Sequence, residues 1–471
     1  MHKNKTPFRF RPFFHALKRC GRAFAAVVFI TMLLNACLPT TPERPTTIPT
    51  IPPLPVRPAY TPQPFITSTA RPEPVPKFIY YVDGNHGSDN NIGTQDQPWK
   101  SIEKVVKTVT AGDLIYVRGG QYDTIKNGWI FQNSGTQTQP ITLKNYPGEQ
   151  VIFKMSNKTE NDHEIFSCSI NPAQPVSWNT PKADYIRIIG SDVSPHVLSN
   201  KLESRKGFVF QGMEGEQSAG INASDCDDWE IAGVDFVELA TGIFTFKNNW
   251  GTMVEHSSDN WYVHDNRVYK YYRETGMQFN GNNNLIANNE IYKITQREDS
   301  PYGCVLLNIT GSHNIIRRNT LDGGGTPAYC VGLRFEWDLA DANLVEQNLI
   351  YDVHIGIDFE GGDNNLIRNN VIFRTIKPIP QLAGIEIRSF DEQKTDWPCN
   401  ETTGTAQALL PADNPANPDY QYYYNPRNCH SYGNQIYNNT IHGYEEAIRL
   451  YPLAGENTII RNNVFSGWKL A

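Results

Sequence analysis

The 471-residue sequence predicts an all-β solenoid, a single-stranded right-handed parallel β-helix with a cap helix at its N-terminal end. Three observations lead to this fold class. An Asn followed by two mostly apolar residues recurs through the second half of the chain, a second set of segments alternates apolar and polar residues, and an amphipathic stretch precedes both. Short strands that return at a regular period indicate coils that each cover the next. We expect this domain to span residues 78–471.

The Asn motif gives the length of one coil. Successive motifs are 23, 30, 29, 22, 69 and 24 residues apart, so the coil has about 22 to 24 residues and the longer intervals contain insertions. We expect the Asn side chains to stack as a ladder, because neighbouring strands lie about 4.8 Å apart and amides at that spacing bond to one another. The ladder residues are Asn266, Asn289, Asn319, Asn348, Asn370, Asn439 and Asn463.

A second strand series lies between the Asn motifs. It starts at Gly276, Gly332, Gly356 and Gly384, and each Gly is followed by alternating apolar and other residues. Because successive side chains of a strand point to opposite faces, one set faces the core and the other faces outward. The predicted core residues are Met277, Phe279, Leu333, Phe335, Ile357, Phe359, Ile385 and Ile387.

The start of the folded part carries an independent signal. The segments Tyr80–Asp89, Pro98–Ile102 and Gly112–Tyr122 closely resemble the N-terminal cap and first coil of exported β-helix proteins, the pectate-lyase-like group that includes polysaccharide lyase families 9 and 6. Residues Ser101–Val109 are expected to form the cap helix, with Ser101 at its start. Such a helix would cover the open end of the solenoid. No comparable cap is evident before Ala471, so we expect further coils or a partner there.

Residues 1–36 have the form of an export signal. They hold seven Lys or Arg and no acidic residue, and the apolar run Ala23–Leu34 follows the basic part. The run ends in Leu34-Asn35-Ala36-Cys37, which resembles the lipobox of bacterial lipoproteins, so lipidation of Cys37 is predicted, with an ordinary cleavable signal as the alternative. Residues 37–77, with 13 of the 32 prolines, are expected to be an unfolded Pro/Thr-rich linker. Together these features predict an exported protein anchored in the membrane through a lipid.

The net charge of the chain limits the classes of molecule that it can bind. Without residues 1–36, 35 Lys and Arg stand against 49 Asp and Glu, so the net charge changes from −7 to −14. Nucleic acid is therefore excluded as a partner, because binding to its phosphates depends on Lys and Arg patches. The resemblance implies an extracellular polysaccharide instead, and we expect a monomer.

A long insertion at residues 391–432 interrupts the coils. Cys399 and Cys429 bracket much of it, and we predict that they form a disulfide, which an exported protein permits. A loop of this length is commonly functional or disordered. Tyr422 and Tyr423 within the insertion, together with Trp337, are therefore candidate substrate-binding side chains.

The outward positions of the second strand series become charged in the middle coils. Side chains on neighbouring coils lie about 5 Å apart and alternate residues of a strand about 7 Å apart, so these charges are expected to gather in one groove. One interpretation is a solvated ladder of ion pairs without a function, since exposed pairs contribute little. The other is a carbohydrate-active site. The residues are Arg334, Glu336, Asp358, Glu360, Glu386 and Arg388.

The first chemistry considered for this groove is β-elimination by a polyuronate lyase. Such an enzyme neutralises the substrate carboxylate, commonly with Ca²⁺, and removes the neighbouring proton. Arg388 or Arg334 would be the base or the charge neutraliser, although arginine is a poor base. Family 9 lyases use a lysine with calcium-binding aspartates; no such aspartate cluster is evident here, and Lys247 is the nearest basic candidate. The predicted oxygen ligands for Ca²⁺ are Asp358, Glu360 and Glu386.

A glycoside hydrolase is the alternative enzyme. It needs two carboxyls about 5 to 5.5 Å apart for retention or about 6.5 to 9.5 Å apart for inversion. Glu336 with Glu360 fits the first range, and Asp358 with Glu360 fits the second. Crowding of like charges should raise the pKa of one carboxyl, as a general acid requires. A non-catalytic surface protein that binds glycans or has a structural role is the third possibility.

Overall fold

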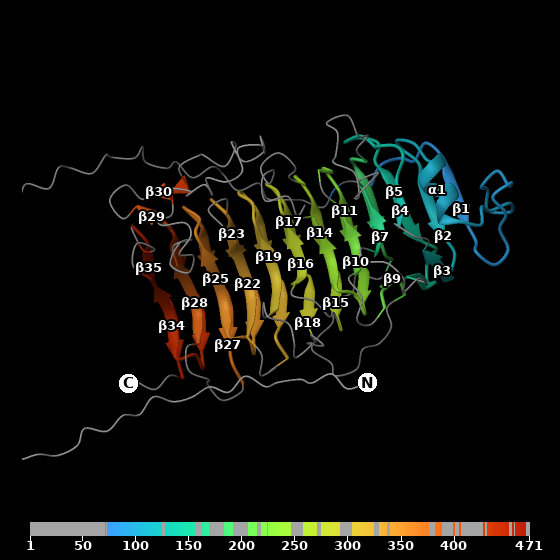
Figure 1. Cartoon of the computed structure of the whole chain (residues 1–471). Helices are drawn as coiled ribbons and strands as arrows, with labels where there is room; N and C mark the ends of the chain where they lie inside the picture. Colours follow the sequence, from blue (N-terminus) through green and yellow to red (C-terminus); the bar gives the residue numbers. More distant parts are fainter. Residues whose placement is uncertain are drawn as a thin grey trace, which may run out of the picture. The chain divides into compact units, whose positions relative to one another are not determined.

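Short parallel strands make up most of the folded chain (Figure 1). In this computed structural model the described residues are 71, 73–124, 128–155, 163–168, 183–191, 206–213, 218–223, 225–245, 258–270, 275–292, 304–324, 329–336, 340–375, 382–388, 431–451, 455 and 457–467. The backbone of three further strands is also described, at residues 399–400, 405–406 and 427–428.

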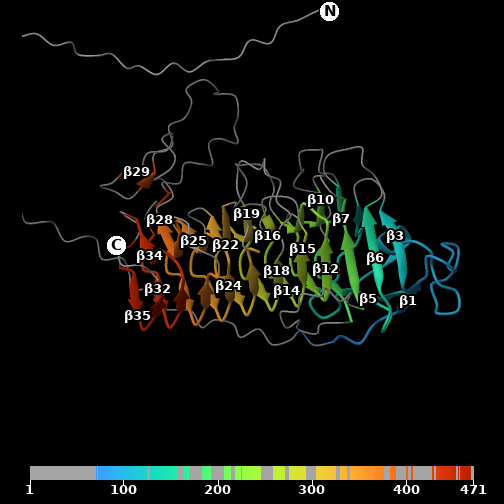
Figure 2. The same cartoon turned by 90° about the horizontal axis from the view of Figure 1, so that it is seen from below.

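Most coils add one strand to each of three sheets, whose strands pair in parallel along the stack (Figure 2). This arrangement confirms the predicted right-handed parallel β-helix. The first sheet contains β1 (Ile79–Val82), β2 (Leu114–Val117), β5 (Ile141–Asn145), β8 (Ile186–Ile189), β11 (Glu230–Ala232), β14 (Tyr262–His264), β17 (Leu285–Ala287), β20 (Ile315–Arg317), β23 (Leu344–Glu346), β26 (Leu366–Arg368), β32 (Gln435–Tyr437) and β35 (Ile459–Arg461).

The other two large sheets follow the same axis. The second sheet contains β3 (Gly120–Thr124), β6 (Val151–Met155), β9 (Phe208–Gln211), β12 (Val234–Val237), β15 (Arg267–Tyr269), β18 (Glu290–Tyr292), β21 (Thr320–Asp322), β24 (Leu349–Tyr351), β27 (Val371–Phe373), β33 (Thr440–His442) and β36 (Val464–Ser466). The third sheet contains β4 (Trp129–Ile130), β7 (His163–Ser167), β10 (Ser218–Asn222), β13 (Thr241–Phe244), β16 (Thr275–Phe279), β19 (Cys304–Ile309), β22 (Cys330–Glu336), β25 (Ile355–Glu360), β28 (Ala383–Arg388) and β34 (Glu446–Leu450). A small antiparallel sheet joins β29 (Cys399–Asn400), β30 (Thr405–Ala406) and β31 (Arg427–Asn428).

The predicted Asn ladder is confirmed, and it runs along the turn between the first and second sheets. From Asn266 to Asn463, each side-chain Nδ2 donates to the Oδ1 of the next ladder Asn at 2.9 to 3.1 Å. The residue before each ladder Asn has a φ of 53 to 59°, so the backbone turns through the left-handed region there. The ladder thus satisfies buried polar groups at a turn that would otherwise leave them unpaired.

Two further ladders were missed by the sequence analysis. One precedes the first-sheet strands, and each backbone N–H in it donates to the Oδ1 of the Asn on the next coil at 2.8 to 2.9 Å. Its members are Asn284, Asn314, Asn343, Asn365 and Asn434. The other, which we call the corner ladder, lies a few residues earlier in each coil and contains Asp184, Asp227, Asp259, Asn282, Ser312, Asp341 and Asp363.

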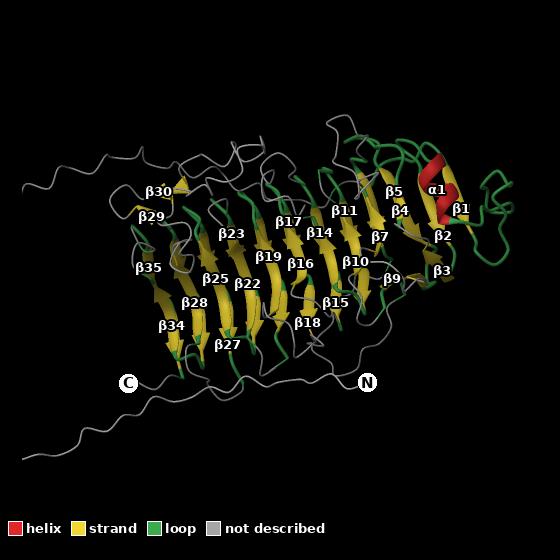
Figure 3. Cartoon of the chain, viewed as in Figure 1, coloured by secondary structure: helices red, strands yellow, loops and turns green. Residues whose placement is uncertain are grey.

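The N-terminal cap is also confirmed. Helix α1 (Ile102–Thr108) lies at the N-terminal end of the stack (Figure 3), and the Ser101 hydroxyl accepts the Lys104 N–H at 3.1 Å as its N-cap. Within the described ranges, no helix is long and apolar enough to cross a membrane. The cap residues Ile102, Val105, Val106 and Val109 are buried, as are all eight predicted core residues of the third sheet.

The end of the segment predicted as a linker contacts the solenoid. Arg71 donates to the backbone carbonyls of Asp228 and Asn260 at 3.0 and 2.7 Å. Glu73 accepts from Lys144 at 3.0 Å and lies 3.8 Å from the buried Arg187. Arg71 and Glu73 therefore contact the first sheet and its turns from β5 to β14.

Two disulfides join neighbouring coils, Cys168 with Cys226 and Cys304 with Cys330. The disulfide predicted from the sequence, between Cys399 and Cys429, is a different pair. Cys429 lies outside the described residues, and for Cys399 in β29 only the backbone is described. The predicted bond between these two cysteines therefore stays a prediction.

Candidate active site on the third sheet

Strand register brings the predicted charged residues together in two rows on the third sheet. In the first row, Arg334 pairs with Asp358, Asp358 with Glu386, and Glu386 with Arg449. In the second row, Glu336 pairs with Glu360 and Glu360 with Arg388. The predicted gathering of the six residues is thus present, and Arg449 extends it by one coil.

Asp358 is the centre of this cluster. Its two carboxylate oxygens accept from Nε and Nη2 of Arg388 at 3.0 and 2.7 Å. Nε of Arg334 donates to the same carboxylate at 3.2 Å. Asp358 is 0% exposed, so its charge is balanced by these two guanidinium groups and not by water.

Glu360 is the more accessible neighbour of Asp358. It contacts Nη2 of Arg388 and lies 3.8 Å from Nε of Arg334, and its side chain is 20% exposed. Burial raises the pKa of Glu360, and the charges of Asp358 and Glu336 raise it further, against the opposing effect of the two arginines. Glu360 therefore holds its proton to a higher pH than an ordinary glutamate.

Glu386 and Glu336 lie on either side of this centre. Glu386 accepts from Nη1 of Arg449 at 2.7 Å and lies 3.5 Å from Nε of Arg388. Burial raises the pKa of Glu386, and Asp358 adds to the shift. Glu336 accepts a hydrogen bond from Nδ2 of Asn308 at 2.7 Å.

The charged cluster is less exposed to solvent than the sequence suggested. The interpretation as a solvated ladder of ion pairs is wrong for its centre, because the side chains of Asp358, Glu386 and Arg388 are only 0, 4 and 8% exposed. At this burial an ion pair cannot be treated as a weak surface contact. The sequence pattern gave the direction of each side chain but not the depth at which the charges lie.

The guanidinium groups are held in their charged form. Arg388 has a pKa raised well above its ordinary value, because the effects of Asp358 and Glu360 exceed that of its burial. The pKa of Arg334 is also raised, first by Glu360 and then by Asp358, against burial. Neither residue can accept a proton from a substrate in this state.

The predicted calcium ligands do not fit a shared cation position. Asp358, Glu360 and Glu386 each contact a guanidinium group. Among the described residues, no group of three or more His, Cys, Asp or Glu side chains is arranged to hold a metal ion. Calcium dependence of the protein therefore stays a prediction.

Several predicted residues cannot be placed. Trp337, Tyr422 and Tyr423 lie outside the described residues, as do Cys37 and the basic candidate Lys247. Substrate binding by the predicted aromatic side chains therefore stays a prediction.

Tyr329, within electrostatic range of the cluster, and its neighbour His354 were missed by the sequence analysis. The Tyr329 ring lies 5.5 Å from the ring of His354 on the next coil. His354 is 7% exposed, and its Nδ1 accepts the Cys330 N–H at 3.0 Å. Burial and the nearby Arg374 lower the pKa of His354 to about 4, so its ring is neutral.

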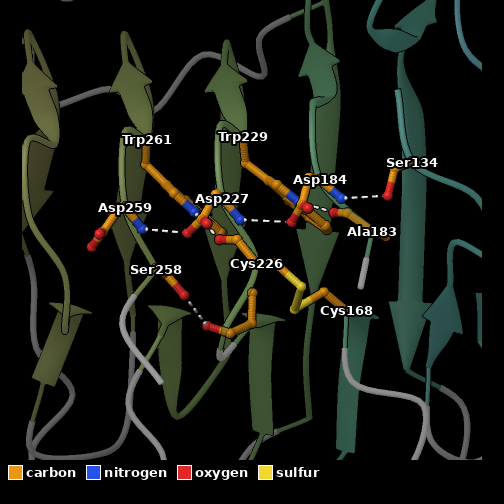
Figure 4. The surroundings of a disulfide bond; sticks show 11 residues. Ser134, Cys168, Ala183, Asp184, Cys226, Asp227, Trp229, Ser258, Asp259 and Trp261 are labelled. Atoms are coloured by element: carbon orange, nitrogen blue, oxygen red, sulfur yellow. Dashed lines mark hydrogen bonds between the residues drawn. A yellow bond between two sulfur atoms is a disulfide. The ribbon is translucent and has the colours of Figure 1, made fainter. Parts of the chain in front are cut away.

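Three aspartates of the corner ladder, Asp184, Asp227 and Asp259, form a second acidic group near the disulfide Cys168–Cys226 (Figure 4). Asp184 accepts the Asp227 N–H at 3.0 Å, and Asp227 accepts the Asp259 N–H at 2.9 Å. Burial, followed by Asp184 and Asp259, raises the pKa of Asp227 to about 6. On later coils Asn, Ser or Asp occupies the same position. The hydrogen bonds of the ladder therefore join each coil to the next.

The fold is similar to several solved carbohydrate-active proteins. The lacto-N-biosidase of family GH136 from Eubacterium ramulus has a TM-score of 0.41 at 11% identity, over 83% of this chain and 68% of that one. A rhamnogalacturonan lyase gives 0.40 at 14%, over 82% and 87%. The A-module of the Azotobacter vinelandii mannuronan C-5 epimerase AlgE4 gives 0.43 at 12%, over 83% and 98%.

Sequence comparison gives shorter but closer matches. The chain is 47% identical to pectate lyase PEL9 of Emericella nidulans over 67 residues, which are 14% of this chain and 16% of that protein. It is 26% identical to the uncharacterized protein YwoF of Bacillus subtilis over 144 residues, 28% of this chain and 30% of that one. The matches thus span less than a third of either relative. Residues 80–303, just under half of the chain, match the Pel9A-like right handed β-helix family, which confirms the predicted resemblance.

Proposed function

We propose that this protein is a β-helix enzyme that cleaves glycosidic bonds of an extracellular polysaccharide at the charged cluster of the third sheet. The observation that carries the proposal is the state of Glu360. Its pKa is raised, its side chain keeps 20% exposure, and it is in register with a second carboxylate, Glu336. A carboxyl group with a raised pKa beside an accessible carboxylate is the kind of pair that acid-assisted glycoside hydrolysis requires.

The proposed steps follow from these two side chains. Glu360 donates its proton to the glycosidic oxygen as the bond from that oxygen to the anomeric carbon breaks. Glu336 forms a bond to the same carbon, and water, deprotonated by Glu360, later displaces it. Neighbouring coils are about 4.8 Å apart, which suits the short carboxyl separation of a retaining enzyme. The arginines and Asp358 hold Glu360 in place.

A polyuronate lyase is the second candidate, and the match of residues 80–303 to the Pel9A-like family favours it. The similarity to a pectate lyase over 67 residues points the same way. Elimination needs a base, and Arg334 and Arg388 are held protonated. The base would then come from outside this cluster, and the two arginines would serve to bind the substrate carboxylate.

We further propose that the protein acts outside the cytoplasm, anchored through a lipid on Cys37. The basic and apolar residues 1–36 and the lipobox-like sequence support this location. The two disulfides between coils are also in keeping with an oxidising compartment. Labelling with radioactive palmitate would test the anchor, since wild type should incorporate label and Cys37→Ser should not. Equal labelling of both would refute the anchor.

The enzymatic proposal is tested with the full chain in detergent on a panel of neutral glycans and polyuronates, with Ca²⁺ or a chelator. New reducing ends without the ultraviolet absorbance of an unsaturated product would support hydrolysis. Absorbance that depends on Ca²⁺ would establish the lyase instead, and neither signal would leave a glycan-binding or structural role.

A matched pair of variants then locates the site. Glu360→Gln should abolish turnover, because an amide cannot donate the proton. Glu346→Gln is the control, since Glu346 also pairs with an arginine, Arg368, but lies on the first sheet. Full activity of Glu360→Gln would show that another site carries the reaction.

A further inference from the structure

The outer face of the first sheet carries a row of four leucine and isoleucine side chains, which we call the apolar row. Leu285, Ile315, Leu344 and Leu366 are in register on β17, β20, β23 and β26. The residue that follows each of them belongs to the core of the solenoid and is 0% exposed, so the apolar row itself points outward. The row forms an apolar cluster of its own, separate from the core.

The apolar row is buried although it points outward. Leu285, Ile315 and Leu344 are only 5, 8 and 2% exposed. Outward apolar residues elsewhere in the solenoid are far more open: Val371 on the second sheet is 41% exposed. Ile459, in the same row of the first sheet but on β35, is 49% exposed. A further segment or molecule therefore covers the row from β17 to β23 and does not reach β35.

The chain before β1 approaches the apolar row from the N-terminal end of the stack. The Lys77 N–H donates to the Gly112 carbonyl at 2.8 Å, two residues before β2. Arg71 donates to the carbonyls of Asp228 and Asn260, two residues before β11 and β14. Six residues, counted back from Lys77, thus pass three to four strands of the first sheet. This rate is that of an extended proline-rich chain, since six residues at about 3.1 Å match four strand spacings of about 4.8 Å.

The residues before Arg71 can continue the same path. At the same rate, the six residues from Ala70 back to Phe65 would pass β17 and β20 and reach β23. Their sequence, Phe-Ile-Thr-Ser-Thr-Ala, carries no charge, and Ile and Thr favour an extended backbone. Phe65 and Ile66 stand at the end that would reach Leu344. Residues 65–70 lie outside the described residues, and the contacts of Arg71 fix the place from which they start.

We propose that residues 65–70 cover the apolar row as an extended strap, with Phe65 and Ile66 packed against Leu344 and its neighbours. Removal of apolar surface from water on both sides favours the docked strap over a free linker. The strap would hold together coils that are distant along the stack, whereas the hydrogen bonds of the sheets join only neighbours. The tether from the predicted lipid on Cys37 would then leave the solenoid beside β23 and not beside the cap helix. This inference does not depend on the proposed enzymatic function.

The test measures exposure of the apolar row by hydroxyl-radical labelling and mass spectrometry of the full chain in detergent. Leu321, which is 0% exposed, and Leu450, which is 42% exposed, are the buried and exposed reference leucines. In wild type, Leu344 should be labelled as weakly as Leu321. In the strap variant, Phe65→Ser with Ile66→Ser, labelling of Leu344 should rise several-fold towards that of Leu450. Leu321 should stay weakly labelled, which shows that the core is intact.

A control variant and two contrary outcomes make the test decisive. Ile48→Ser with Ile51→Ser removes two apolar side chains from the same predicted linker and should leave Leu344 at its wild-type labelling. Labelling of Leu344 in wild type as strong as that of Leu450 would overturn the inference, because the row would then be uncovered. Protection of Leu344 that persists in the strap variant would also overturn it and assign the cover to another occupant. Light scattering at rising protein concentration would then show whether that occupant is a second copy of the chain.

Discussion

Arg388 donates from Nε and Nη2 to the two carboxylate oxygens of Asp358, at 3.0 and 2.7 Å. The two residues lie on neighbouring strands but in different rows, so the contact crosses the sheet diagonally. A bidentate pair of this kind fixes the orientation of both side chains. It also holds Nη2 of Arg388 against Glu360, the proposed acid.

Replacing Asp358 should therefore destabilise the fold strongly. Asp358→Asn keeps the shape but leaves the charges of Arg388 and Arg334 without their buried anion, and loss of one partner of a buried pair costs about 3 to 5 kcal/mol. We expect this decrease in the free energy of unfolding, measured by urea denaturation. Glu446→Gln is the control, because its pair with Arg449 is exposed and should contribute less than about 1 kcal/mol. Equal unfolding midpoints for the two variants would contradict this account of Asp358.

The Asn ladder should respond to a single truncation. Asn370 donates to the Val345 carbonyl at 3.0 Å and to Oδ1 of Asn439 at 2.9 Å, and it accepts the Asn348 N–H at 3.0 Å. Asn370→Ala leaves these buried groups unpaired, at a cost of about 1 to 3 kcal/mol each. We expect the free energy of unfolding to fall by about 2 to 4 kcal/mol.

The neighbouring Asn369 provides the control for this truncation. It is exposed and has a φ of 56°, a conformation that glycine adopts without strain. Asn369→Gly should leave the unfolding midpoint nearly unchanged. A loss as large as that of Asn370→Ala would show that the turn conformation, and not the ladder, stabilises this region.

These residues also show what could be read from the sequence. The Asn ladder was predictable because each member sits beside the same apolar pair at a short period. The six charged residues were predictable as a group because strand alternation fixes which side chains share a face. The diagonal contact from Arg388 to Asp358 was not, since it depends on side-chain conformations across two coils whose separation in sequence varies with loop length.

Tyr329 and the corner ladder escaped detection for other reasons. Tyr329 lies one residue before β22, so the alternation of side chains along the strand does not predict which way its own side chain points. The corner ladder changes among Asp, Asn and Ser, because any side-chain oxygen can accept the next coil's N–H, so no single residue type marks it. The aspartates Asp184, Asp227 and Asp259 lie 43 and 32 residues apart, and their stacking needs the fold to be known.

The stacked aspartates should make stability depend on pH. Asp227 has a pKa raised to about 6, so the fold favours its neutral form. Its stabilising contribution is complete below the ordinary carboxyl pKa of 3.8 and is lost as the pH rises through about 6. Asp227→Asn keeps the acceptor oxygen without the charge. We expect it to match wild type at about pH 4 and to exceed its unfolding free energy by about 1 to 2 kcal/mol at about pH 8.

The control for this pH effect is Asp123→Asn. Asp123 is exposed on β3 and accepts from Gln121 at 2.7 Å. Its substitution should change the unfolding free energy little at either pH. If Asp227→Asn is no more stable than wild type at about pH 8, the burial of Asp227 and its repulsion by Asp184 and Asp259 do not cost the stability that we assign to them.

The pH dependence of turnover should report the state of Glu360. A general acid works while protonated, so kcat/KM is expected to fall as the pH rises through the raised pKa of Glu360. Arg334 is the first of the two arginines that oppose this rise, so Arg334→Gln should move the alkaline limb of the profile to higher pH. Arg368→Gln removes an arginine paired with Glu346 on the first sheet and should leave the limb in place. An alkaline limb that does not move in Arg334→Gln would show that a group other than Glu360 supplies the proton.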